Sequence, residues 1–118
     1  MAGRAIVVDD HAAFRSSARR LLELVGYDVV GEAGDGSTGL ALAREFEPEL
    51  VLLDIALPDM SGFDVAEALA GGSSTVVLVS SRAAADLGKR ATRSGARGFI
   101  PKDRLSEDAL REVVGERQ

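Results

Sequence analysis

The stretch LVLLD, residues 50–54, places four apolar residues in a row and ends on an acid. A strand with one face in water alternates apolar and polar residues, whereas a strand covered on both faces is apolar throughout. Similar short runs lie at residues 5–8, 28–31, 76–79 and 98–100, and helical patterns separate them. Five such strand–helix units predict a doubly wound α/β fold, in which a parallel sheet carries helices on both faces.

The segments between these runs have the periodicity of amphipathic helices. Between Phe14 and Val25 the apolar residues recur at helical spacing, and Gly26 is well placed to end that helix. A second helix is expected over residues 39–46, before Pro48. The remaining helices are expected over about residues 62–70 and 83–94 and from Ser106 onward, where the serine is a good N-cap.

The composition limits the class of protein and the kind of site. The length of 118 residues suits a single domain over residues 1–118 with no output domain in this chain. The net charge of −5 disfavours direct nucleic-acid binding. Cysteine is absent and the single histidine cannot form a multi-histidine zinc site, so a bound metal needs oxygen ligands, as Mg²⁺ does. Since no signal peptide or membrane span is visible, we expect a cytoplasmic protein without membrane contact.

Polar residues follow the apolar runs at the points where the strands are expected to end. The first run is followed by Asp9 and Asp10, the third by Asp54, the fourth by Ser80 and the fifth by Lys102. A doubly wound sheet binds ligands at the carboxyl ends of its strands. Two carboxylates about 4 Å apart repel by roughly 4 kcal/mol at an effective dielectric near 20, and a divalent cation removes that repulsion. The pattern therefore predicts a Mg²⁺ site suited to phosphoryl transfer, with the central carboxylate as nucleophile.

The order and spacing of these motifs resemble the receiver domain of two-component response regulators. The motifs are VVDDH at residues 7–11, LLDIALPDMSG at 52–62, VSS at 79–81 and GFIPK at 98–102. The resemblance covers essentially the whole chain and is strongest to receivers of NarL/LuxR-type transcription regulators. It implies a flavodoxin-like sheet of five strands in the order 2-1-3-4-5, with five helices.

The resemblance implies a phosphoacceptor and a metal site. Asp54 would accept the phosphoryl group from the phosphohistidine of a sensor histidine kinase. Asp10, Asp54 and the backbone carbonyl of Ala56 would bind Mg²⁺ directly, and Asp9 would reach the ion through water. Lys102 would pair with the acceptor carboxylate and then with the phosphoryl oxygens. Phosphorylation and dephosphorylation would be catalysed by the domain itself, without a separate substrate.

The resemblance also implies a switch. Ser80 would move to bond the phosphoryl group, Phe99 would swing inward behind it, and Ser81 would offer its backbone N–H. The face formed by the fourth helix, the fifth strand and the fifth helix would then control an output domain or partner, with transcription regulation as the expected result. A homodimer, or a C-terminal DNA-binding output domain absent from this chain, would be the partner of that face.

Three positions depart from the usual pattern of the family. Asp103 follows Lys102, where many members have a proline joined by a cis bond, so this loop is expected to differ. The switch position holds Ser80 rather than the commoner threonine. Ser81 is larger than the usual alanine or glycine and would crowd the phosphoryl pocket.

Simpler interpretations exist for several of these residues. Asp9 and Asp10 could cap the first helix, Phe99 could be an ordinary core residue, and His11 is expected in a partly solvated loop or first helical turn. Basic residues around the fourth helix could be a solvated face or a contact surface for an acidic partner; they are Arg82, Lys89, Arg90, Arg93 and Arg97.

Two other functions compete with the receiver interpretation. A Mg²⁺-dependent phosphatase on a similar sheet usually needs an acid two residues after the nucleophile, and position 56 is alanine. An interaction module with a dormant site would lack an acid or the lysine, and neither is missing.

Overall fold

The computed structural model describes residues 3–82 and 86–115. Its five strands form one parallel sheet in the order β2-β1-β3-β4-β5. This confirms the doubly wound sheet and its strand order. The strands are β1 (Gly3–Val8), β2 (Tyr27–Ala33), β3 (Leu50–Asp54), β4 (Thr75–Ser80) and β5 (Gly98–Pro101).

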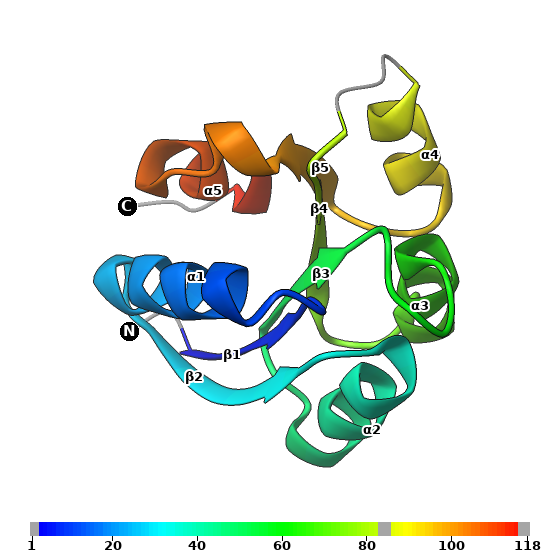
Figure 1. Cartoon of the computed structure of the whole chain (residues 1–118), viewed down its shortest axis with the longest axis horizontal. Helices are drawn as coiled ribbons and strands as arrows, with labels where there is room; N and C mark the ends of the chain where they lie inside the picture. Colours follow the sequence, from blue (N-terminus) through cyan, green and yellow to red (C-terminus); the bar gives the residue numbers. More distant parts are fainter. Residues whose placement is uncertain (1–2, 83–85, 116–118) are drawn as a thin grey trace.

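Helices cover both faces of the sheet. Figure 1 shows α1 and α5 on one face and α2, α3 and α4 on the other. The helices are α1 (Ala12–Val25), α2 (Gly36–Phe46), α3 (Gly62–Leu69), α4 (Leu87–Arg93) and α5 (Glu107–Val114), and the 3-10 turn η1 (Lys102–Arg104) follows β5. The fourth helix was expected from residue 83, but residues 83–85 lie outside the described part of the chain.

The helix ends follow local signals in the sequence. Gly26 takes the left-handed conformation that closes α1, and Ser106 caps α5 by accepting the Ala109 N–H at 3.0 Å. The second helix begins before the expected residue 39, because Asp35 caps it by accepting the Thr38 N–H at 2.7 Å. The Lys102–Asp103 peptide bond is trans.

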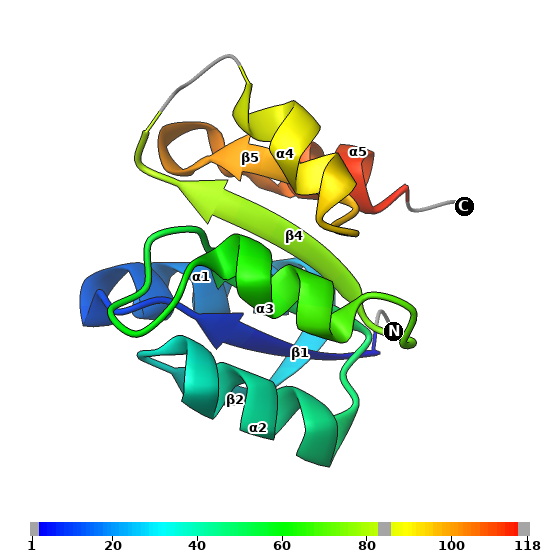
Figure 2. The ribbon, with the colours of Figure 1, turned by 90° about the vertical axis from the view of Figure 1, so that its right-hand side faces the viewer.

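The sheet separates two apolar cores. Residues of β3 alternate between them, with Val51 and Leu53 in the core under α2, α3 and α4, and Leu50 and Leu52 in the core under α1 and α5. All four side chains are completely buried. The strand is apolar throughout because both of its faces are covered, as its sequence indicated. Figure 2 shows the same sheet from the side of α3 and α4.

Gly62, the first residue of α3, packs directly against the end of β3. Its N–H donates to the Ile55 carbonyl at 2.7 Å, and a Cβ here would overlap the Asp54 carbonyl oxygen. Gly62→Ala is therefore expected to lower the free energy of unfolding by about 1–3 kcal/mol, measured by urea denaturation. The matched control is Gly88→Ala in α4, where a Cβ meets nothing within 4 Å. It should leave stability unchanged or raise it by up to about 1 kcal/mol, and equal losses in both variants would contradict the packing argument.

Candidate functional site

The carboxyl edge of the sheet brings together Asp9, Asp54 and Lys102. Asp9 follows β1 and has no exposed surface, and Asp54 ends β3 with 3% exposed. The Lys102 ammonium lies 2.7 Å from Asp9 Oδ2 and 3.5 Å from Asp54 Oδ2. The lysine is thus closer to Asp9 than to Asp54, the carboxylate with which the resemblance paired it.

The buried position of Asp54 changes its acidity. Desolvation raises the pKa of the Asp54 carboxyl, and the negative charge of Asp9 raises it further. The Lys102 ammonium and the Ala56 N–H, which donates to Asp54 Oδ1 at 3.3 Å, act in the opposite direction. The negative charge of ionised Asp54 is therefore only partly balanced by the groups around it.

Asp10 and His11 complete the acidic cluster on its solvent side. The His11 Nδ1 atom lies 3.2 Å from Asp9 Oδ1 and 3.1 Å from Asp10 Oδ1, although 70% of the His11 side chain is exposed. Asp9, Asp10, His11 and Asp54 each place one potential ligand atom within 4.8 Å of the others. His11 is partly solvated, as expected, yet it contacts both acids.

Helix capping does not explain Asp9. The residue before α1 is His11, whose side chain makes no capping hydrogen bond. Asp9 Oδ1 accepts the backbone N–H of His11 at 2.8 Å, outside the helix. Its Oδ2 forms an ion pair with the Lys102 ammonium at 2.7 Å, and within residues 3–82 and 86–115 it accepts no hydrogen bond. A buried carboxylate oxygen that has an ammonium beside it but accepts no hydrogen bond can still accept one from water held by a cation.

The donor set of this edge fits a hard divalent cation. Three carboxylates and one ring nitrogen, that of His11, meet there, so oxygen atoms predominate, and hard cations such as Mg²⁺ prefer oxygen ligands. The backbone at Ala56 is also fixed, since this residue forms an antiparallel bridge with Ser61. The residues present therefore suit a magnesium ion better than a metal that requires nitrogen or sulfur ligands.

Ser80 and Ser81 lie at the same edge, at the end of β4. In the register of β3 and β4, Asp54 pairs with Val79, so Ser80 lies one position beyond the level of Asp54. The Ser80 side chain is buried, and its hydroxyl accepts the Arg82 N–H at 3.0 Å. Ser81 is exposed.

Phe99 lies on β5, paired in register with Leu78 of β4. It is partly buried and packs against the core under α2, α3 and α4. This position agrees with an ordinary core residue as well as with a switch. Among the basic residues of the fourth helix, Arg90 lies over the Phe63 ring at 4.3 Å, and the described basic side chains of this region are exposed.

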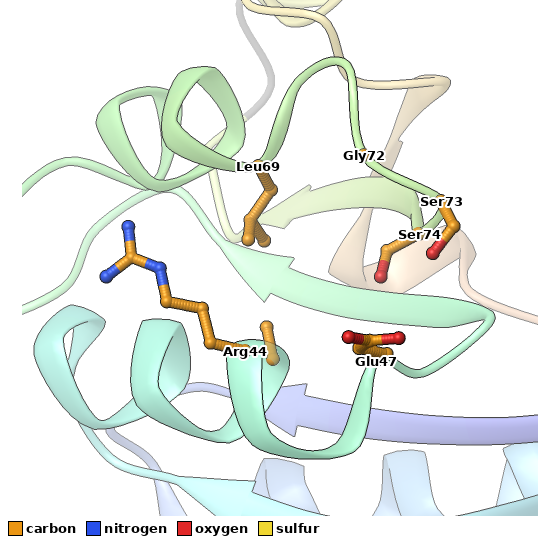
Figure 3. A pocket seen from close by; sticks show the side chains of 7 residues that line it. Arg44, Glu47, Leu69, Gly72, Ser73 and Ser74 are labelled. Atoms are coloured by element: carbon orange, nitrogen blue, oxygen red, sulfur yellow. The ribbon is translucent and has the colours of Figure 1, made fainter.

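A cavity of about 310 Å³ lies away from these acids. It is formed where α2 and α3 end and β4 begins, near the amino ends of the strands (Figure 3). Its lining residues are 43, 44, 47, 69 and 72–74. The polar cluster at the strands' carboxyl ends is thus a separate feature of the molecule.

The sequence profile described as "Response regulator receiver domain" matches residues 5–115. The chain belongs to the response regulator receiver family. Receivers are the regulatory, phosphate-accepting domains of two-component response regulators, and this match confirms the resemblance drawn from the motifs.

Similar receivers are found in bacterial transcription regulators. The chain is 34% identical over 116 residues to the virulence regulator BvgA of Bordetella pertussis, covering 97% of this chain and 54% of BvgA. It is 36% identical over 114 residues to the regulator NarL of Mycobacterium tuberculosis, covering 94% of this chain and 53% of NarL. The solved receiver domain of that NarL superposes with a TM-score of 0.87 at 35% identity, covering 98% of both chains. This receiver therefore spans about half the length of the curated relatives it matches.

Across the described ranges 3–82 and 86–115, no helix has the length and apolar character required to cross a membrane.

Several residues around the site were not singled out from the sequence. Arg15 donates from Nη1 to the Asp9 carbonyl at 2.6 Å and pairs with Glu32 of β2. The Asp59 carboxylate accepts the N–H groups of Gly36 and Ser37 at 2.7 and 2.9 Å, which ties the loop after β3 to the start of α2. Asp59 lies in the LPDMSG motif, but no local signal shows that its partners lie more than twenty residues earlier.

Proposed function

We propose that Asp54 is the phosphoacceptor of this receiver and that a sensor histidine kinase is the donor. The observation that carries the proposal is the buried cluster of Asp9, Asp54 and Lys102 at the edge where the strands end. A carboxylate beside a fixed ammonium and further acids is suited to attack a phosphoryl group when the added charge is neutralised.

The transfer forms one bond and breaks another. An oxygen of Asp54 attacks phosphorus, the phosphorus–nitrogen bond of the phosphohistidine breaks, and the imidazole nitrogen keeps the electron pair and takes a proton. The Lys102 ammonium is close enough to stabilise the negative charge that develops on the phosphoryl oxygens. A bound Mg²⁺ would supply further neutralisation of these oxygens. The proposed metal ligands are Asp10, Asp54 and the Ala56 carbonyl, with Asp9 acting through water.

The domain is proposed to catalyse its own phosphorylation and dephosphorylation. The acyl phosphate adds about −1.5 to −2 charges at Asp54. Ser80 is the proposed hydroxyl that bonds the new group, with the Ser81 N–H as a further donor and Phe99 as the aromatic switch. The response is then passed to the face formed by α4, β5 and α5.

The relatives support a role in transcription regulation, because BvgA and NarL are named as transcription regulators. We propose that this single receiver domain controls an output domain or partner protein, or forms a homodimer, in the cytoplasm. Its net charge of −5 argues against direct nucleic-acid binding by residues 1–118.

The test is incubation of the chain with acetyl phosphate, with and without Mg²⁺, followed by intact mass spectrometry. A gain of one phosphoryl group that needs Mg²⁺ and maps to Asp54 supports the proposal. Repeated turnover of small phosphate esters would indicate a phosphatase instead. Absence of any metal-dependent gain would contradict the phosphoacceptor function.

Ser80→Ala is expected to separate phosphorylation from the response. The variant keeps the acceptor carboxylate and should gain the phosphoryl group, but it lacks the hydroxyl that binds it. Most of the phosphorylation-dependent change in backbone NMR shifts along β5 and α4 should therefore disappear. Ser16→Ala, an exposed serine of α1, is the control that should retain the full change. If the NMR shifts of Ser80→Ala change on phosphorylation as much as those of the wild type, Ser80 is not part of the switch.

A further inference from the structure

Phe14 contributes an aromatic face to the site. Its ring centroid lies 4.4 Å from Nζ of Lys102, within the distance of about 6 Å over which a ring attracts a cation. Phe14 lies in the first turn of α1 and is partly buried against the core under α1 and α5. The same side chain therefore belongs to the core and touches the lysine of the phosphate-accepting edge.

Three groups surround the Lys102 ammonium, whose side chain is 15% exposed. Two are the carboxylates of Asp9 and Asp54, and the third is the Phe14 ring. A lysine has a flexible four-carbon stem, so carboxylates can be reached from many of its rotamers. The ring contact favours those rotamers in which the ammonium remains above the aromatic face.

An aromatic ring suits this position better than another acid or an aliphatic side chain. An additional carboxylate would compete with Asp54 for the ammonium, and an aliphatic group would not attract it. The ring quadrupole attracts a cation but carries no net charge and accepts no proton. The lysine is thereby held in place while its charge stays available to a phosphoryl group on Asp54.

We propose that Phe14 is a positioning residue that holds the Lys102 ammonium beside Asp54 during phosphoryl capture. This inference rests on the proposed function, because it assigns Phe14 a role through Lys102. Phe14 acts only through Lys102, because a hydrocarbon ring neither accepts the phosphoryl group nor transfers a proton.

The test compares phosphorylation rates of the wild type, Phe14→Leu and Phe14→Tyr, using acetyl phosphate and a series of Mg²⁺ concentrations. Phe14→Leu should slow the rate at saturating Mg²⁺ by about 3- to 10-fold, the size expected from losing one cation–π contact. The Mg²⁺ midpoint should stay unchanged, because the ring acts on the lysine. Phe14→Tyr keeps the aromatic face and should react at nearly the wild-type rate.

Val25→Ala is the matched control. Val25 lies at the other end of α1 and packs against the same core cluster, so its truncation loses packing without touching Lys102. It should react at the wild-type rate. Equal slowing in Val25→Ala and Phe14→Leu, or no slowing in Phe14→Leu, would overturn the inference.

Proton NMR of the Lys102 Cε methylene gives a second readout that needs no phosphorylation. The Phe14 ring current should shift this signal upfield in the wild type, and Phe14→Leu should remove the shift. A phosphorylated wild type without the upfield shift overturns the inference on Phe14 alone. A wild type that takes no phosphoryl group overturns the proposed function, whatever the position of the lysine signal.

Discussion

Asp54→Asn is expected to abolish phosphorylation completely. The carboxylate oxygen is the proposed nucleophile, and the neutral amide that replaces it cannot form the acyl phosphate. The substitution keeps the size and shape of the side chain, so the fold should be retained. Intact mass spectrometry after incubation with acetyl phosphate and Mg²⁺ should show the gain in the wild type and none in the variant.

The matched control is Asp59→Asn in the same loop. The Asp59 carboxylate accepts two N–H groups of α2 and does not belong to the cluster of potential metal ligands. The control protein should still gain one phosphoryl group. Loss of the gain in Asp59→Asn with retention in Asp54→Asn would place the acceptor elsewhere.

The same Asp54 variant should alter the pH dependence of stability without metal. Because burial and Asp9 raise the pKa of Asp54, the native state binds more protons than the unfolded state above the ordinary pKa of aspartate. The stability that this group contributes is therefore lost as the pH rises from the ordinary pKa of aspartate to the raised pKa of Asp54. In EDTA, urea denaturation at increasing pH should show a smaller decrease in the free energy of unfolding for Asp54→Asn than for the wild type. Parallel pH curves for the two proteins would contradict the raised pKa.

Lys102→Met is expected to lower the free energy of unfolding by about 3 kcal/mol in the absence of metal. The methionine matches the stem of lysine but removes the ammonium that lies 2.7 Å from the fully buried Asp9 carboxylate. The loss of this cation leaves an uncompensated charge beside a second acid. Urea denaturation in EDTA measures the effect.

Two further measurements separate charge from packing. Adding Asp9→Asn to Lys102→Met should recover most of the lost stability, because the buried, unpaired negative charge of Asp9 is then removed. Lys89→Met, on the exposed surface of α4, should leave stability within about 0.5 kcal/mol of the wild type. If Asp9→Asn recovers nothing, the electrostatic account of Lys102 is wrong.

The sheet and the edge that carries the acids could be predicted because their signals are local. The apolar run LVLLD indicated a strand covered on both faces, and the acid after it marked the carboxyl end. The strand order came from the resemblance. Parallel strands then bring the residues after each run to one edge, which is how Asp9, Asp54 and Lys102 meet.

Other features depend on rotamers and on contacts between distant segments, which local patterns do not encode. The spacing of apolar residues placed Phe14 on the core face of α1 but could not show its ring beside Lys102. Likewise, no pattern indicated that Lys102 lies nearer Asp9 than Asp54. The early start of α2 depended on the Asp35 cap, which the apolar periodicity does not contain.

The bonds from Asp59 to the first two N–H groups of α2 have a consequence for how this receiver moves. They connect the segment that follows Asp54 to the start of α2, on one flank of the sheet, in the unphosphorylated chain. Charge added at Asp54 therefore meets, on this side, a segment that is already hydrogen-bonded to α2. We expect the conformational change that follows phosphorylation to occur mainly on the opposite side, at the end of β4 and in α4. The tie to α2 would thus set the direction of the change.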